Sequence, residues 1–237
     1  MNPALRRSSA HVFVEALTAP SLDERDRHHL LRVLRLRAGE AVTVSDGAGA
    51  WRVCRLGPEG TLTPDGDIVV GHSRGDSPSV SLTVGVAIPK AERPEWIVQK
   101  LTEIGVDHIV FVAAARSVVR WDAAKAARNL ERLVAREAAM QSRRLTIPVV
   151  DGPLALSELL AASSASAALA LAEPGEADLD PSINGVLIGP EGGWSPAELD
   201  LVERRVGLGP TVLRVETAAL VAATRLVQLH RGAGHAE

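Results

Sequence analysis

The chain has 237 residues, of which 46% are hydrophobic, and its formal net charge is −3. These values suit one large or two small globular domains and argue against a disordered chain, a fibre or a protein that coats nucleic acid through net charge alone. The single cysteine, Cys54, excludes an internal disulfide and a multi-cysteine zinc site. In "WRVCRL" it is either a small buried core residue, which we favour, or a reactive thiol.

Segments that would place the chain in or across a membrane are not found in the sequence. No run approaches the ~18 uncharged apolar residues that a spanning helix needs. The first residues, "MNPALRRSSAHVFVEA", lack the apolar core of a signal peptide. We therefore expect a cytoplasmic protein.

The first third of the chain is predicted to be mostly β-structure. In "EAVTVSDGAGAWRVCRL" two alternating apolar runs flank a loop opened by Asp46-Gly47, which is typical of a hairpin with a longer loop. Another strand is predicted in "DIVVGH", and a short helix in "HHLLRVLRLRAGE" that would end at Gly39, with Leu30 and Leu34 on its apolar face. These elements favour a small barrel, which we place in residues 1–75.

Beyond a polar, turn-rich linker at His72–Val80, apolar strands alternate with helices. Strands are predicted in "SLTVGVAIP", "DHIVFVAAA", "AALALAE", "GVLIGP" and "TVLRV". Helices are predicted in "RPEWIVQKLTEIG", in residues 122–144 and in "ETAALVAATRLVQLH". Continuous apolar strands separated by helices indicate a parallel sheet covered on both faces, so residues 76–237 are expected to form an α/β domain.

Charge is distributed unevenly along this second part. Residues 116–144 carry eight Arg or Lys against three Asp or Glu, whereas residues 151–210 carry ten acids against two arginines. The predicted helix over 122–144 would turn Leu130, Leu133, Val134 and Ala138 inward. Its basic row consists of Arg128, Arg132 and Arg136, with Arg143 continuing it. Such a row is typical of a surface for an anionic partner or of a solvated helix face, and charge alone leaves both open.

Three loops are expected where ligands of parallel α/β sheets bind, beyond the carboxyl ends of the strands. They are Glu173-Pro174, Gly189–Gly193 and the "RVETA" turn at Arg214–Ala218. After the second loop, the helix is expected to begin at Ser195 as N-cap, with Glu198 completing a capping box.

The glycine-rich turn "IGPEGGWSPAEL" raises the question of its ligand. Turns of this kind often hold a phosphate, but this one has no lysine, matches neither G-x-x-x-x-G-K-[ST] nor G-x-G-x-x-G, and carries Glu191, which would repel a phosphate. Its glycines would let the backbone approach a flat group such as adenine, or a group with donors such as a ribose or an ammonium. A tight turn that binds nothing is the remaining alternative.

Four blocks of the sequence together resemble one family. They are "HHLLRVLRLRAGEAVTVSDGAG", "IPKAERPEWIVQKLTEIGVDHI", "REAAMQSRRLTIPVV", and "IGPEGGWSPAEL" followed by "LGPTVLRVETAAL". In this order they cover nearly the whole chain and resemble the RsmE family, bacterial 16S rRNA (uracil-N3)-methyltransferases of the SPOUT superfamily.

The resemblance implies a fold and an activity that periodicity could not have revealed. The second domain would be a SPOUT α/β domain with a C-terminal trefoil knot, and the first a PUA-like β-barrel that binds RNA. A homodimer with the active site at its interface would bind S-adenosylmethionine and methylate N3 of a specific uridine of 16S rRNA, on the assembled small ribosomal subunit, with no metal and no membrane partner. The alternatives are a non-enzymatic RNA-binding or ribosome-assembly module, a SPOUT enzyme with another RNA target, and a nucleotide-phosphate enzyme that uses the glycine-rich loop.

The resemblance also assigns residues by position. The implied cofactor residues are Glu173, Ile188, Gly189, Pro190, Glu191, Gly192, Gly193, Leu208, Gly209, Val212, Leu213, Arg214, Glu216, Thr217 and Ala218. Leu213 and Val215 are core residues in the alternative interpretation. Glu191 suits the cofactor because the methyl donor is a sulfonium cation with an ammonium group. A structural role for Glu191, in bonding neighbouring backbone N–H groups, is equally open.

Methyl transfer to N3 of uracil requires removal of a weakly acidic proton and stabilisation of the resulting anion. The candidate general bases are Glu103 and Glu216, and the candidates for holding a phosphate or the uracil anion are Arg116 and Arg143; a solvent base is also possible. The implied RNA-binding residues are Arg6, Arg7, His28, Arg32, Arg35, Lys90, Arg93, Arg136 and Arg144. His28 and His29 lack the partner cluster that a metal site needs.

Overall fold

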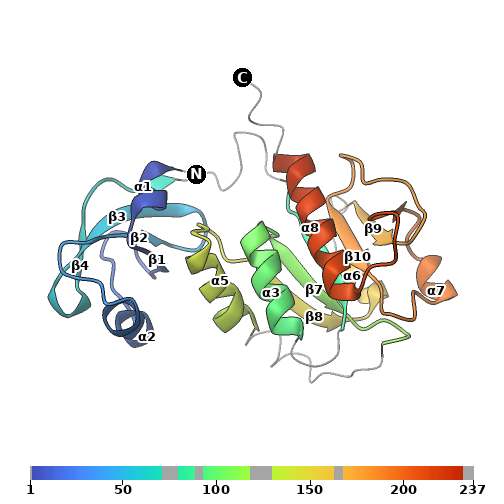
Figure 1. Ribbon diagram of the computed structural model, residues 1–237, viewed down its shortest axis with the longest axis horizontal. Helices are drawn as coiled ribbons and strands as arrows, with labels where there is room; N and C mark the ends of the chain where they lie inside the picture. The colour runs from blue at the N-terminus through green and yellow to red at the C-terminus, as the bar shows by residue number, and fades with distance from the viewer. Residues whose placement is uncertain (1, 71–79, 89–92, 118–129, 163–167, 232–237) are drawn as a thin grey trace. The chain divides into compact units, whose positions relative to one another are not determined.

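The computed structural model describes residues 2–70, 80–88, 93–117, 130–162 and 168–231 (Figure 1). The chain divides into two compact units, Met1–Arg74 with Glu137–Ile147, and Gly75–Arg136 with Pro148–Glu237. Residues 137–147 therefore belong to the first unit, although the boundary expected at residues 75/76 assigns them to the second. Within the described ranges, no helix is both long and apolar enough to cross a membrane.

The first unit is built on one small sheet (Figure 1). Its strands follow the order β1-β2-β3-β4, with β5 also paired to β3, and only the β1–β2 pair is parallel. The elements are α1 (Pro3–Arg7), β1 (Ala10–Phe13), α2 (Glu24–His28), the π-helix η1 (His29–Val33), β2 (Ala41–Ser45), β3 (Ala50–Leu56), η2 (Pro58–Gly60), β4 (Leu62–Pro64) and β5 (Val69–Val70). The predicted hairpin is confirmed as the antiparallel pair β2–β3.

Alternating side chains of this sheet form the core of the first unit. Val12, Val42 and Val44 are fully buried against Leu30 of the π-helix. Cys54 belongs to the same core, and burial raises the pKa of its thiol to about 11. The structure therefore favours the core role of Cys54 over the reactive thiol.

The predicted helix that would end at Gly39 starts and ends earlier than expected. It begins at α2, where the side chain of Asp23 caps the backbone N–H of Asp26 at 2.7 Å, and ends with η1 at Val33. Arg35 then adopts a left-handed backbone (φ 55°), which no helix can continue. Leu34 follows this end and is 41% exposed, whereas Leu30, which was predicted to share its helix face, is fully buried.

The helix predicted over residues 122–144 also ends early. Its described part is the π-helix η3 (Leu130–Ala135) followed by α5 (Arg136–Gln141). The chain leaves α5 through a Schellman turn, in which Arg143 is left-handed (φ 57°) and the Arg144 N–H donates to the carbonyl of Ala139 at 2.9 Å. Leu130 and Ala138 are buried as predicted, but Leu133 is 37% exposed.

Hydrogen bonds integrate the segment 137–147 into the first unit. The guanidinium of Arg143 donates to the carbonyl of Leu5 (2.8 Å) and to the hydroxyl (2.5 Å) and carbonyl (2.7 Å) of Ser8. The hydroxyl of Ser45 donates to the carbonyl of Leu145 at 2.8 Å. Because these bonds join residues a hundred or more positions apart, no local sequence pattern signals them.

A buried histidine lies at the centre of this network. His11 is only 3% exposed, with Nε2 2.9 Å from the carbonyl of Arg144 and Nδ1 3.0 Å from the hydroxyl of Thr43. A carbonyl only accepts, so Nε2 carries the proton. Burial lowers the pKa of His11 to about 4. The hydrogen bond with the Arg144 carbonyl opposes this shift by a smaller amount, and the positive charge of Arg143 adds a still smaller lowering.

We expect the first unit to lose stability on mild acidification because of His11. The unfolded chain protonates this histidine below its ordinary pKa of 6.5, whereas the folded chain does so only at about 4. The contribution of His11 to the free energy of unfolding is therefore fully present above pH 6.5. It falls by about 3 kcal/mol in total as the pH drops to 4, and it does not change further below pH 4.

Urea denaturation at about pH 7.5 and about pH 4.5 measures this effect. His11→Gln should remove this part of the pH dependence, whereas His28→Gln, which replaces an exposed histidine of the same unit, should retain it. Equal pH dependence in the His11 variant and the wild type would contradict the assignment.

The second unit contains the predicted parallel sheet. All of its strand pairs are parallel, in the order β11-β9-β10-β6-β7-β8. The elements are β6 (Thr83–Ala87), α3 (Arg93–Ile104), β7 (His108–Val112), η3, β8 (Val149–Leu154), α6 (Leu156–Ala162), β9 (Leu169–Ala172), β10 (Gly185–Ile188), α7 (Pro196–Leu199), β11 (Arg205–Val206) and α8 (Val215–Arg231).

Helices cover both faces of this sheet, as predicted. On one face α8 lies beside α3 and packs on β6 and β10 (Figure 1), with Ala219, Ala222 and Leu226 fully buried along one stripe. On the other face Leu156 and Leu159 of α6 join a core cluster with side chains of β7, β9 and β10.

The strand predicted in "TVLRV" is wrong. Residues 211–214 form a loop, α8 already begins at Val215, and the last strand is the two-residue β11. The apolar run is not buried in the sheet: Val212 is 83% exposed and Leu213 is half-buried. The short strands β8 and β11 were not predicted.

Candidate functional site

A cavity of about 600 Å³ lies at the carboxyl edge of the sheet in the second unit. Strands β11, β9 and β10 are adjacent and parallel, so the loops that follow them leave the sheet at this edge. The cavity has the size of a small-molecule site. Its lining consists of Ala172, Glu173, Pro174, Ile188, Gly189, Pro190, Glu191, Gly192, Gly193, Leu208, Gly209, Thr211, Val212, Leu213, Arg214, Val215 and Ala218.

The structure brings together the three loops predicted to bind the cofactor. Of the residues assigned to that role, all line the cavity except Glu216 and Thr217, which lie in the first turn of α8. Pro174, predicted as part of the first loop but not assigned to the cofactor, also lines the cavity. Ala172 and Thr211 line it too and were missed, although each directly adjoins a predicted residue. Val215 lines the cavity as well, so its core alternative is not the whole of its role.

Two glycines of the central loop are required by its shape. Gly193 has a left-handed backbone (φ 69°) and donates its N–H to the carbonyl of Pro190 at 2.8 Å, which closes a tight turn. A Cβ at Gly189 would lie 2.9 Å from Nε1 of Trp194. Because Trp194 is buried in the core with Leu199 packed against its cluster, the indole has little room to move.

The predicted capping box is present and extends to a second loop. Glu198 is 8% exposed, and its carboxylate accepts the backbone N–H of Ser195 (2.8 Å), the hydroxyl of Ser195 (2.7 Å) and the N–H of Ala115 (2.8 Å). Burial raises the pKa of Glu198, but these hydrogen bonds and the charge of Arg116 outweigh it and leave that pKa below its usual value.

Arg116 links the same two loops in the opposite direction. Its Nη1 donates to the carbonyls of Gly192 (2.9 Å) and Trp194 (3.2 Å). The loop after β7 and the glycine loop after β10 are thus fastened by a carboxylate on one side and a guanidinium on the other. In this structure Arg116 shapes the cavity wall and does not line the cavity; its predicted role with a phosphate or a uracil anion stays a prediction.

The charges in the cavity lining favour a cationic ligand over a polyphosphate. The charged side chains are Glu173, Glu191 and Arg214, so carboxylates exceed cations, and no lysine is among them. Apolar side chains such as Ile188 and Leu208 supply a surface on which an aromatic ring can lie. This lining does not suit the nucleotide-phosphate enzyme considered from the sequence.

Two family models match the chain. Residues 76–227 match an RNA methyltransferase domain, and residues 22–61 match an RNA methyltransferase PUA domain. Over 220 residues, the chain is 36% identical to ribosomal RNA small subunit methyltransferase E of Mycobacterium tuberculosis, with 85% of this chain and 83% of the relative covered. The chain belongs to the RsmE family of RNA methyltransferases.

Other members of the RsmE family and solved structures are similar over most of their length. The Bacillus subtilis ribosomal RNA small subunit methyltransferase E is 28% identical over 234 residues, covering 88% of this chain and 90% of the relative. The crystal structure of ribosomal RNA small subunit methyltransferase E from Neisseria gonorrhoeae, bound to S-adenosyl methionine, has a TM-score of 0.77 at 28% identity and covers 93% of this chain and 97% of that one. A probable rRNA-methyltransferase from Porphyromonas gingivalis has a TM-score of 0.76 at 28% identity, with 93% and 98% covered.

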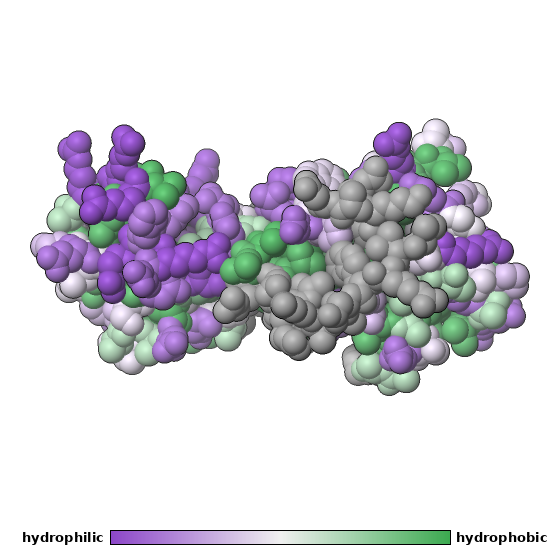
Figure 2. Space-filling model, turned by 90° about the horizontal axis from the view of Figure 1, so that it is seen from below, coloured by the Kyte–Doolittle hydropathy of each residue, from purple (hydrophilic) through white to green (hydrophobic). Residues whose placement is uncertain are grey.

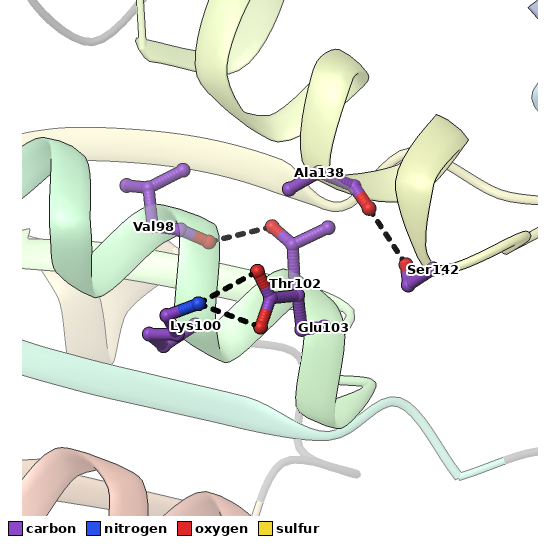
Figure 3. Close-up of polar contacts among 6 residues, drawn as sticks. All are labelled: Val98, Lys100, Thr102, Glu103, Ala138 and Ser142. Carbon is purple, nitrogen blue, oxygen red and sulfur yellow. Dashed lines mark hydrogen bonds and ion pairs between the residues drawn. The ribbon is translucent and has the colours of Figure 1, made fainter.

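The remaining catalytic candidates are not gathered at the cavity. Glu103, on α3, accepts two 2.9 Å bonds from Nζ of Lys100 (Figure 3) and does not line the cavity. On the same helix the hydroxyl of Thr102 donates to the carbonyl of Val98. The hydroxyl of Ser142, directly after α5, donates to the carbonyl of Ala138 (Figure 3). Glu216 is half-buried in α8. Arg143 belongs to the first unit, where its donors hold Leu5 and Ser8.

The candidate RNA-binding residues lie mainly on the first unit. Hydrophilic side chains spread over the face of this unit shown at the left of Figure 2. The exposed candidates are Arg6, Arg7, His28, Arg32 and Arg35, whereas Arg136 and Arg144 are half-buried. Lys90, Arg128 and the side chains of Arg93 and Arg132 lie outside the described residues. Within the described ranges, no group of three or more His, Cys, Asp or Glu could hold a metal ion.

Proposed function

We propose that this chain transfers a methyl group from S-adenosylmethionine to N3 of a specific uridine of 16S rRNA, on the assembled small ribosomal subunit. Membership of the RsmE family supports RNA methylation that depends on S-adenosylmethionine. One observation supports the assignment of this function to particular residues. It is the cavity at the carboxyl edge of the parallel sheet, which is lined by the loops whose sequences resemble the family signature.

The lining suggests how the cofactor would be held. Ile188, Leu208 and Leu213 would contact the adenine, and the glycines of the central loop would let the backbone approach the ribose. Glu173 or Glu191 would face the positively charged part of the ligand. When bound, S-adenosylmethionine supplies an electrophilic methyl group on its sulfonium.

The substrate side requires a base and a stabilised anion. Uracil N3 is a poor nucleophile until its imide proton leaves, so we propose that Glu103 or Glu216 removes the proton and that Arg116 or Arg143 stabilises negative charge. A homodimer with its active site at the subunit interface, a C-terminal trefoil knot and a cytoplasmic location complete the proposal. The open cavity would then be closed by the second subunit and by RNA.

The decisive experiment is methylation of small ribosomal subunits that lack this modification, followed by mapping of the modified base. We expect one uridine, methylated at N3. In single-turnover reactions across pH, Glu103→Gln or Glu216→Gln should lower the rate by about 10²-fold or more. Full rates in both variants would exclude these side chains as the base, and labelling of another nucleotide would identify a different RNA target.

Glu191 provides a direct test of the cofactor assignment. Glu191→Gln should weaken S-adenosylmethionine binding by about tenfold, because it removes the negative charge that faces the cationic ligand. Calorimetry measures the effect, with Glu203→Gln as the control, an exposed glutamate of the same unit that does not line the cavity. Wild-type protein should not bind ATP, with or without magnesium. Wild-type protein that binds no S-adenosylmethionine would support the non-enzymatic alternative.

A further inference from the structure

A second cavity, of about 100 Å³, lies within the first unit, and none of its lining residues lines the cavity proposed to hold S-adenosylmethionine. It is formed by the start of β1, the π-helix η1 and the end of α5. Its polar lining includes His29, Gln141 and Arg143, and its apolar lining includes Leu34 and Met140. Both chain segments of the first unit, 1–74 and 137–147, therefore contribute residues to this small cavity.

Arg143 keeps an uncompensated positive charge at this cavity. All of its hydrogen bonds go to neutral acceptors, the carbonyl of Leu5 and the hydroxyl and carbonyl of Ser8. Among the described residues it forms no ion pair with a carboxylate. The guanidinium is half-buried, so its charge is less screened by water than a fully exposed one and attracts an anion more strongly.

Two further groups can donate hydrogen bonds into the cavity. His29 and Gln141 line it, and in the described part of the chain neither side chain has a hydrogen-bond partner. An imidazole N–H and an amide NH₂ are both donors to phosphate oxygens. His11 also lines the cavity, but its two ring nitrogens are occupied by Thr43 and Arg144.

The backbone around the cavity is held in unusual conformations. Arg35 and Arg143 are two of the three non-glycine residues with positive φ in the described chain, and they adjoin or line the cavity. His29 and Leu30 of the π-helix η1 also line the cavity, and π-helices are frequent at functional sites. Left-handed backbone at bulky residues is costly and is also concentrated at binding sites.

The chain around Leu34, which lines the cavity, combines apolar and basic side chains. Leu34 is 41% exposed and Val33 58%, and their sequence neighbours Arg32 and Arg35 are exposed. Single-stranded RNA is bound by this combination, in which cations contact the backbone and apolar groups contact ribose or base. Two carboxylates of this unit have partners. Glu137 pairs with Arg25 at 3.3 Å, whereas Glu40 accepts the Arg37 N–H at 2.7 Å and keeps its negative charge beside Ser9, which lines the cavity.

We propose that this cavity binds a backbone phosphate of the RNA substrate. Arg143 supplies the charge, His29 and Gln141 supply hydrogen bonds, and the adjoining ribose lies against Leu34 and Met140. The proposal rests on the RNA substrate proposed above. It changes the role of Arg143 from a catalytic residue to an RNA-binding one.

Binding of unmodified 16S rRNA by purified full-length protein, measured over a series of salt concentrations, tests the proposal. Arg143→Gln should weaken binding by about tenfold. It should also reduce the slope of log affinity against log salt by about 0.7, the value for one lost phosphate contact on single-stranded nucleic acid. Because Arg143 also holds Leu5 and Ser8, a second variant, His29→Ala combined with Gln141→Ala, leaves those bonds intact and should weaken binding about threefold or more.

The matched control is Arg55→Gln, which removes one positive charge from the same unit at an arginine paired with Asp65 at 2.7 Å. It should bind RNA within about twofold of wild type, since exposed paired charges contribute little. Wild-type affinity and salt slope in a folded Arg143→Gln, or wild-type affinity in the double variant, would overturn the proposal. The proposed function would fail separately, if the wild-type protein neither methylated small subunits nor bound S-adenosylmethionine.

Discussion

Glu198→Ala is expected to weaken S-adenosylmethionine binding by about tenfold or more and to destabilise the second unit by about 3 kcal/mol. The carboxylate accepts three hydrogen bonds while 8% exposed, and its removal leaves the N–H groups of Ser195 and Ala115 without their acceptor. The glycine loop would then lose one of its two fastenings to the loop after β7. Calorimetry gives the affinity, and urea denaturation gives the free energy of unfolding.

Glu158→Ala is the matched control, because Glu158 occupies the same position in α6 and accepts the N–H of Ala155 at 2.8 Å, but it is exposed and outside the cavity. It should cost about 1 kcal/mol and leave the cofactor affinity unchanged. Glu198→Gln should be intermediate, since an amide offers one acceptor oxygen where the carboxylate offers two. If Glu198→Ala and Glu158→Ala bound the cofactor equally well, Glu198 would have no positioning role.

The same carboxylate makes the site sensitive to acid. The pKa of Glu198 is lowered in the folded chain from its ordinary value of 4.5. The contribution of Glu198 to stability is therefore fully present above pH 4.5. It is lost as the pH falls through the lower pKa that this carboxyl has in the folded chain. In Glu198→Gln the part of the pH dependence of stability that comes from Glu198 should disappear. The part that comes from His11 should remain, because the two groups lie in different units.

Local patterns in the sequence were sufficient for elements whose cause is local. The hairpin over β2 and β3 follows from alternation around a turn, and the start of α7 follows from Ser195 and Glu198 three positions apart. The parallel sheet follows from continuous apolar strands between helices. The loops that line the cavity could be located by combining this topology with the resemblance to the RsmE family.

Long-range contacts and unusual backbone conformations could not be predicted in the same way. Nothing near Ala115 indicates that its N–H bonds to Glu198, 83 positions later. The early ends of two predicted helices come from left-handed backbone at Arg35 and Arg143, a conformation for which arginine carries no sequence signal. The packing of 137–147 with the first unit likewise depends on bonds to Leu5, Ser8 and Ser45.

Gly207→Ala is expected to open the cavity from its other side. A Cβ at this position would lie 2.4 Å from the backbone carbonyl oxygen of Glu176 and 3.2 Å from its carbonyl carbon, and backbone atoms cannot rotate away as a side chain can. The segment around Gly207 is also joined to the segment around Glu176 by a hydrogen bond, in which the Gly207 N–H donates to the carbonyl of Ala177 at 2.7 Å. We expect a loss of about 2–3 kcal/mol of stability and about tenfold in S-adenosylmethionine affinity.

Both effects have one cause, the displacement of the loop that carries Leu208 and Gly209 from the loop that carries Glu173 and Pro174. Thermal unfolding and calorimetry measure them. Gly192→Ala serves as the control for stability, because its new carbon would lie 3.6 and 3.7 Å from carbon atoms of Arg116, an ordinary contact, so its melting temperature should stay within about 2 °C of wild type. A Gly207→Ala variant as stable as Gly192→Ala would show that these two segments separate without cost, and the cavity wall would then be less rigid than its hydrogen bonds imply.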